Sequence, residues 1–226
     1  MPKVIKRRPG GKGRHEEILS ESVGDLRERL RERQKTLTYA LLAFGAVVLL
    51  VVAFMVYTRA TASKAADLQA EGYRIFFGEA STRFATPADR YKSALEKFQK
   101  AYATKKSPVA LLYIADSYYE LGNYDEAIRT LKDLTSRYSD PRIVSLATYK
   151  LASAYTKKGD TAAALATLTA LADKKDSPLR DLALLESGRV LEAAGKKEEA
   201  KAKYKALIDT FPQSPLVPEA KARMAS

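Results

Sequence analysis

Hydrophobic and polar positions divide the chain into two parts with different patterns. From Thr36 to Thr58 no residue is charged, and the stretch from Leu41 to Tyr57 is almost entirely apolar. As a helix, residues 36–58 would span about 34 Å, which is enough to cross a bilayer core of about 30 Å. Tyrosines near both ends suit the membrane interfaces. The pattern therefore predicts one N-terminal transmembrane helix over residues 36–58.

Beyond the apolar run, hydrophobic residues recur at intervals of three and four, which is the period of an amphipathic helix. Gly122, Gly159 and Gly195 interrupt this pattern at nearly equal distances. We interpret each glycine as the turn between two helices that share an apolar face, and the spacing as a repeat. The residues predicted to pack between helices are, unit by unit, Leu111, Ile114, Ala115, Tyr118, Ala127, Leu131 and Leu134; then Leu151, Ala152, Tyr155, Ala164, Leu168 and Leu171; then Leu184, Gly188, Leu191, Ala200, Tyr204 and Leu207.

This order of aliphatic, small and aromatic residues resembles the tetratricopeptide repeat superfamily. In such a hairpin Ala115 and Ala127 would be small because the two helices cross there, and Ser187 departs from the pattern at a position that is usually apolar. The resemblance implies stacked helical hairpins, each covering its apolar face with its neighbours. The predicted fold is all-α, with one N-terminal transmembrane helix followed by an α-solenoid of tetratricopeptide-like hairpins over residues 62–226.

Both ends of the predicted solenoid depart from the regular repeat. The first unit is degenerate, with a first helix expected from about Ala62 to Phe77 and an unusually long link before the second helix. The segment after Pro215 is predicted to form a short helix that covers the last apolar face. We therefore expect about four hairpins and a C-terminal cap.

The region before the span predicts the orientation in the membrane. Residues 1–21 are expected to form a disordered basic cytoplasmic tail, and residues 22–35 an amphipathic juxtamembrane helix. Lysines and arginines are more numerous before the span than just after it, so the N-terminus is predicted to be cytoplasmic. The residues expected to set this orientation are Arg27, Arg29, Arg31, Arg33 and Lys35.

For a bacterial chain, the corresponding localisation is the inner membrane, crossed once, with the C-terminal domain in the periplasm. A cleaved signal peptide is the alternative, because Ala60-Thr61-Ala62 has the form of a cleavage site. The long apolar run and the long region before it favour an uncleaved anchor.

Residue types exclude several kinds of chemistry. The chain has no cysteine, and its single histidine, His15, lies in the basic tail. Disulfides, thiolate metal sites and a histidine-based triad in the folded part are therefore excluded. No glycine-rich phosphate loop follows a predicted strand. We expect no catalytic residues, no metal and no cofactor, and the protein is predicted not to be an enzyme.

The remaining candidate for function is a protein-binding surface. In tetratricopeptide stacks the first helices of the hairpins line the concave face. Counting helical turns from the packing residues assigns to that face Leu112, Asp116, Tyr119, Tyr149, Ser153, Thr156, Leu185, Arg189 and Glu192. Tyr119 and Tyr149 could grip a peptide with their rings while the charged residues set its polarity. The alternative for both tyrosines is packing between helices.

The order of parts resembles bacterial inner-membrane tetratricopeptide proteins typified by the ancillary subunit of the SecYEG translocon, a family that includes cell-division coordinators. That resemblance implies a chaperone-like or scaffolding role beside the translocon, with translocon subunits, secreted chains or periplasmic chaperones as partners. An envelope-assembly or cell-division scaffold is the alternative. A nucleic-acid or ribosome contact through the basic tail is a weaker one, because no aromatic residues are interleaved there for base stacking. The sequence leaves the oligomeric state open.

Overall fold

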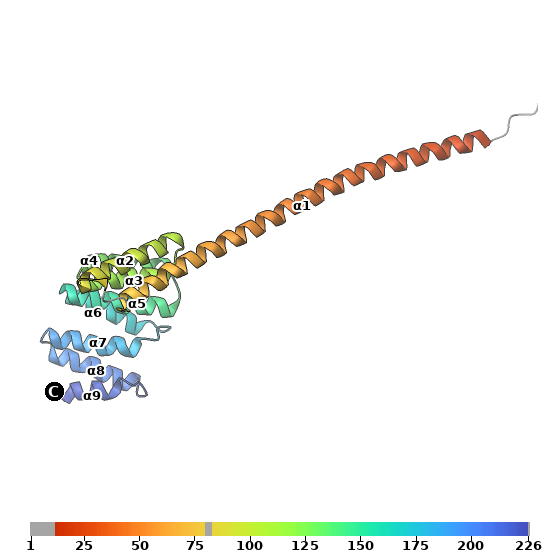
Figure 1. The fold of residues 1–226 in the computed structure, drawn as a ribbon. Coiled ribbons are helices and arrows are strands. Elements are labelled where there is room, and N and C mark those ends of the chain that lie inside the picture. Colours follow the sequence, from red (N-terminus) through yellow and green to blue (C-terminus); the bar gives the residue numbers. More distant parts are fainter. Residues whose placement is uncertain (1–11, 80–82, 226) are drawn as a thin grey trace, which may run out of the picture. The chain divides into compact units, whose positions relative to one another are not determined.

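The computed structural model describes residues 12–79 and 83–225, and all secondary structure in those ranges is helical (Figure 1). Contacts within the chain divide it after Arg59 into two compact units. The first helix, α1 (Lys12–Phe76), begins in the first unit and ends in the second. Each unit is described by itself.

The helix α1 is longer than the sequence pattern predicted. It begins at Lys12, inside the stretch 1–21 that the sequence assigned to a tail, and residues 1–11 lie outside the described residues. The segments predicted separately as 22–35, 36–58 and 62–77 form one uninterrupted helix as far as Phe76. A physical reason is that no proline occurs between Pro9 and Pro87 to remove a backbone donor and end the helix.

The apolar part of α1 is exposed on all sides within its unit. Every large hydrophobic side chain from Leu37 to Tyr57 is exposed, including Leu49 at 71% and Tyr39 at 70%. Its most apolar stretch has a mean hydropathy of 2.7, and α1 is the one helix among the described residues that is long and apolar enough to cross a membrane. Arg27, Arg29 and the other three residues predicted to set orientation lie before this stretch and are exposed.

The second unit is a stack of helical hairpins that begins with the last turns of α1 (Figure 1). The helices in order are α2 (Pro87–Thr104), α3 (Pro108–Glu120), α4 (Tyr124–Arg137), α5 (Pro141–Lys158), α6 (Thr161–Asp173), α7 (Arg180–Ala193), α8 (Lys197–Thr210) and α9 (Val217–Ala225). From α2 onward each helix packs on the next one in the chain. The predicted α-solenoid and its cap helix are both confirmed.

The turns within the hairpins use glycine in the left-handed conformation. Gly122, Gly159 and Gly195 have φ values of 75°, 87° and 76°. At each turn the following amide donates back to a carbonyl near the end of the first helix, as in the 2.9 Å bond from Asn123 N to Tyr118 O. This hydrogen bond satisfies a carbonyl that the helix end leaves unpaired. The chain turns back through a residue with positive φ, a conformation that glycine adopts at little steric cost.

Most of the predicted packing residues form the interior, and Tyr118, Tyr155 and Leu184 are half-buried against it. Ala115, Ala127, Ala164 and Ala200 are each at most 1% exposed, so the backbones of paired helices approach closely. Ser187 is also buried, at 1% exposed. Its hydroxyl donates a 2.7 Å hydrogen bond to the Ala183 carbonyl of the same helix, which explains how a polar residue occupies an apolar position.

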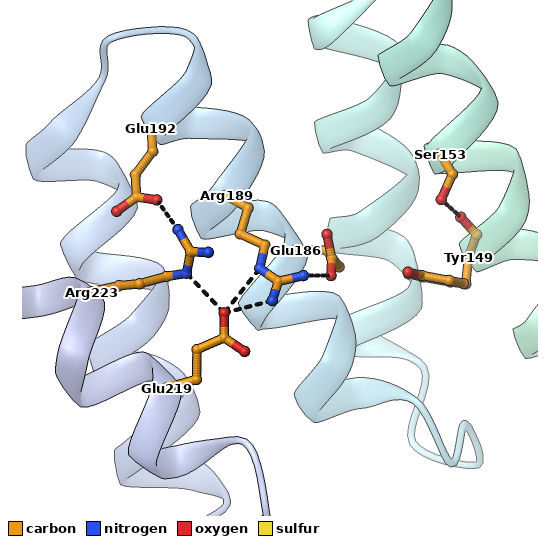
Figure 2. A network of polar contacts seen from close by, with 7 residues as sticks. All are labelled: Tyr149, Ser153, Glu186, Arg189, Glu192, Glu219 and Arg223. Atoms are coloured by element: carbon orange, nitrogen blue, oxygen red, sulfur yellow. Dashed lines mark hydrogen bonds and ion pairs between the residues drawn. The ribbon is translucent and has the colours of Figure 1, made fainter.

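The cap helix α9 is tied to α7 by ion pairs (Figure 2). Glu219 of α9 accepts hydrogen bonds from Arg189 Nη2 at 2.5 Å and from Arg223 Nε at 2.9 Å. Arg189 also donates to Glu186 at 2.6 Å, and Arg223 donates to Glu192 at 2.8 Å. Hydrogen bonds from the two guanidinium groups lower the pKa of Glu219. We call these five side chains the cap network.

Replacing Gly188 by Ala is predicted to destabilise the repeat unit. A Cβ atom at this position would lie only 2.5 Å from Cζ of the fully buried Tyr204 ring. Overpacking of this kind costs about 1–3 kcal/mol, against a gain of up to about 1 kcal/mol from alanine's better helix propensity. Urea unfolding of the detergent-solubilised chain, followed by circular dichroism, measures the net effect. In a Tyr204→Leu background the same substitution should cease to destabilise, and a stabilising Gly188→Ala in the native background would refute the close packing.

Replacing Glu219 by Gln is predicted to reduce stability more at pH 7 than at pH 3. Because the folded-state pKa of Glu219 is below its reference value of 4.5, its ionised form stabilises the fold above that pH. This contribution is lost as the pH falls through the lowered pKa. The side chain is 36% exposed, so solvent screening limits the loss to at most about 1 kcal/mol. Urea midpoints at the two pH values test this, with the exposed Glu198→Gln on α8 as control; an equal loss at both pH values would contradict it.

Candidate functional site

The first helices of three successive hairpins, α3, α5 and α7, line two adjoining hollows with volumes of 330 and 180 Å³. Tyr119, Tyr149 and Ser153 line both, so we treat them as one groove. The larger hollow is also lined by Phe76, Phe77, Tyr113, Ala115, Asp116, Glu120, Leu131 and Lys150. The smaller is also lined by Ala152, Thr156, Lys157, Leu168, Glu186 and Val190.

Two tyrosines form the wall common to both hollows. The Tyr119 ring packs edge-on against Tyr124, with ring centroids 5.6 Å apart, and its other surface faces the groove. Figure 2 shows the Tyr149 ring pointing toward Glu186 of the next hairpin. Both residues are half-buried. The two interpretations from sequence are therefore compatible, because each ring packs between helices and also lines the groove.

The hydroxyl groups along α5 are already hydrogen-bonded within that helix. Ser153 donates to the Tyr149 carbonyl at 3.1 Å, and Thr156 donates to the Ala152 carbonyl at 3.0 Å. Their oxygens retain acceptor capacity toward the groove. These residues can therefore accept hydrogen bonds from a bound chain without needing one to satisfy their own donors.

An ion pair joins α3 and α5 in the larger hollow. Lys150 Nζ lies 2.9 Å from Asp116 Oδ1, with only 17% of the Asp116 side chain exposed. Burial raises the pKa of Asp116, Lys150 lowers it, and the nearby Glu120 carboxylate raises it again. Glu120 is itself exposed and forms no ion pair with any residue in the described ranges. The hollow thus holds two carboxylates and one ammonium group.

The nine predicted groove residues separate into three groups. Asp116, Tyr119, Tyr149, Ser153 and Thr156 line the groove. Arg189 and Glu192 belong to the cap network, where their charges are paired. Leu112 and Leu185 are the third group.

The assignment of Leu112 and Leu185 to the groove surface needs correction. They are 5% and 1% exposed and belong to hydrophobic clusters of the core. Each lies on a face of its helix that a neighbouring element covers, with Phe98 in the cluster of Leu112 and Tyr204 in that of Leu185. Counting turns along a single helix does not reveal which of its faces the neighbouring helices cover.

Several groove residues were not predicted from sequence. Phe76, Phe77 and Tyr113 contribute rings to the larger hollow, and Lys150 contributes its charge. Phe77 follows α1 directly, in the degenerate first repeat with its unusually long link. The sequence signal for Lys150 was its place beside Tyr149 on the same predicted helix, whereas its ion pair with Asp116 is visible only in the structure.

The chemistry available in the groove is that of a contact surface. Among the described residues no group of three or more His, Cys, Asp or Glu side chains is placed to hold a metal ion. The functional groups that line the groove are aromatic rings, an ion pair, the Glu120 carboxylate and hydroxyl acceptors. Such a mixture of rings and a few polar groups is typical of protein-binding surfaces.

Solved structures with a similar fold are tetratricopeptide-like. A crystal structure of the nearly identical TPR-like repeats of a putative kinesin light chain from Podosopora anserina has a TM-score of 0.50 at 17% identity, covering 74% of this chain and 82% of that chain. MamA has a TM-score of 0.46 at 18% identity, covering 63% and 92%. The TPR2AB domain of yeast Sti1, in complex with pHSP90, has a TM-score of 0.44 at 18% identity, covering 72% and 71%.

At these identities the structural likeness concerns the fold alone. No individual curated protein sequence matches the chain. Residues 34–221, which include both the apolar segment and the hairpins, match the family described as Tetratricopeptide repeat-like domain. The matched range covers most of the sequence, and the chain therefore belongs to the tetratricopeptide repeat-like domain family.

Proposed function

We propose that the protein is a membrane-anchored interaction scaffold that works at the periplasmic face of a bacterial inner membrane, as a chaperone-like accessory of the protein translocon. The family fold implies a protein-interaction scaffold, and proteins built from such repeats are generally not enzymes. The anchoring, the compartment and the translocon partner are the proposed parts. The observation that carries the proposal is the exposed apolar surface from Leu37 to Tyr57.

Exposure of that surface to water would be costly. Each large aliphatic or aromatic side chain contributes about 1.5–3 kcal/mol when it is moved from water to an apolar environment. A continuous exposed surface of such residues usually marks a membrane or partner contact. A helix suits the lipid interior because all its backbone groups are paired within the segment. Helix α1 satisfies both requirements over residues 36–58.

The family match supports treating the apolar segment as part of the functional unit. The matched range begins at residue 34 and continues through the repeats to residue 221. An anchor shared with the repeats would tether the groove to the membrane. Tethering raises the effective concentration of the groove for partners in the same membrane, including chains that emerge from a translocon.

The distribution of positive charge supports an orientation with the N-terminus in the cytoplasm. Five basic residues, Arg27 to Lys35, lie immediately before the apolar segment, and short basic flanks are retained on the cytoplasmic side. The groove would then lie outside the inner membrane, where translocon subunits, secreted chains and periplasmic chaperones are the available partners. An envelope-assembly or cell-division partner would use the same anchor and the same groove.

The predicted topology can be measured without background because the native chain has no cysteine. Lys175 is exposed in the repeat unit, and Gln34 is exposed before the apolar segment. A membrane-impermeant maleimide added to spheroplasts should label Lys175→Cys at once and Gln34→Cys only after detergent lysis. Both variants should remain with the membrane after alkaline carbonate extraction. Labelling of Gln34→Cys alone in intact spheroplasts, or release of the chain by carbonate, would overturn the proposal.

A further inference from the structure

Phe77 is an exposed aromatic residue at the edge of the groove. It is 64% exposed, and apart from the apolar segment it is the one large hydrophobic side chain that the described residues leave exposed. Its ring packs edge-on against Phe76 at 5.2 Å and against Tyr113 at 6.1 Å between centroids. The side chain is therefore supported on one side and open on the other, and the open side faces the larger hollow.

The rings behind Phe77 form a packed aromatic cluster. Tyr113 lies 4.5 Å from Tyr73 and 5.2 Å from Phe98 between ring centroids, and Phe76 lies 5.7 Å from Tyr113. Rings held in this way lose little conformational freedom when a partner binds, which is the property of interface residues that dominate affinity. With a volume of 330 Å³, the hollow is at the small end of ligand pockets, which span about 300–1,000 Å³. It suits one large side chain and its backbone.

The charge of the larger hollow is opposite in sign to that of the whole chain. The chain carries a formal net charge of +12, whereas the hollow contains Asp116 and Glu120 against Lys150 alone. The pKa of Tyr119 is raised, first by burial and then by neighbours that include Glu120 and Asp116. This part of the groove therefore favours positive charge. Glu120 has an open side from which a cation can approach, because no ion pair occupies it among the described residues.

We propose that the larger hollow binds an extended polypeptide segment in which a large apolar side chain is followed by a lysine or arginine. The apolar side chain packs between Phe77 and Tyr119, and the cation meets the carboxylate of Glu120. A cation beside the Tyr119 ring also gains the attraction of its aromatic face. An acidic residue at the same position is rejected because it would face the Glu120 carboxylate, while the one ammonium group of the hollow is already paired with Asp116. The inference rests on the proposed function in taking the repeat unit as protein-binding, and it adds the chemistry of the partner.

The binding test uses the full chain in zwitterionic lipid nanodiscs and three fluorescein-labelled peptides. Each peptide is a flexible Gly/Ser segment with a central Phe-Lys, Phe-Glu or Ser-Lys pair, and binding is followed by fluorescence anisotropy. The Phe-Lys peptide should bind most tightly, with each of the other two weaker by roughly tenfold, since a residue that dominates affinity contributes more than about 1 kcal/mol. Equal binding of Phe-Lys and Phe-Glu, or of Phe-Lys and Ser-Lys, would overturn the inference.

Matched variants locate the binding in the larger hollow. Phe77→Ser should weaken the Phe-Lys peptide by roughly tenfold, whereas Tyr138→Ser, which alters a half-buried aromatic outside the groove lining, should not. Glu120→Gln should remove most of the preference for Phe-Lys over Phe-Glu, and Glu198→Gln on α8 should retain it. Circular dichroism checks that each variant is folded. If both members of a pair have the same effect, the binding lies elsewhere and the inference is wrong.

The outcomes separate this inference from the proposed function. Failure of all three peptides to bind, together with external labelling of Lys175→Cys, would refute the ligand chemistry and leave the anchored scaffold standing. Selective binding of the Phe-Lys peptide, together with labelling of Gln34→Cys alone, would support the chemistry and refute the periplasmic scaffold.

Discussion

Each hairpin of the repeat unit has more apolar surface than its own two helices can cover. Leu131 of α4 and Leu151 of α5, from successive hairpins, lie in the same hydrophobic cluster, and both are nearly inaccessible to solvent. The hairpins must therefore stack, and the close crossings at alanine and glycine determine how near the backbones come. The groove is a consequence of that stacking, because it places the first helices side by side and aligns the side chains that they leave uncovered.

A stack of this kind has two ends that would otherwise expose apolar surface. At the C-terminal end α9 covers the last hairpin, where Ala220 is buried in the hydrophobic cluster that includes Leu207, and the cap network adds paired charges between α9 and α7. At the N-terminal end the last turns of α1 pack on α2, with Gly72 directly against the Phe98 ring. The same helix therefore supplies both the first element of the repeat unit and Phe76 at the groove wall. This physical continuity is why we relate the exposed apolar segment and the groove to one function.

Sequence alone was sufficient for the features that local chemistry controls. The positive-φ glycines, the alanine crossings and the cap helix follow from spacing and residue type, and all are in the structure. Features that depend on how one helix packs on another were less predictable. Leu112 and Leu185 have groove-like spacing, yet an adjacent element covers each of them. Arg189 was predicted to contact a bound protein, but in the structure it forms an ion pair with Glu219 of α9. That helix is too short to show a clear periodic signal in the sequence. Phe77 was missed because the first repeat departs from the regular pattern.

The most direct test of the central claim is site-specific photo-crosslinking in living bacteria. A photoreactive phenylalanine derivative replaces Tyr119 in the groove or Glu198 on the exposed face of α8, in otherwise identical full-length chains. The account predicts that position 119 crosslinks to exported polypeptides or to subunits of the membrane translocon, and that position 198 does not. Equal crosslinking from both positions, or crosslinking of position 119 only to cytoplasmic proteins, would contradict it.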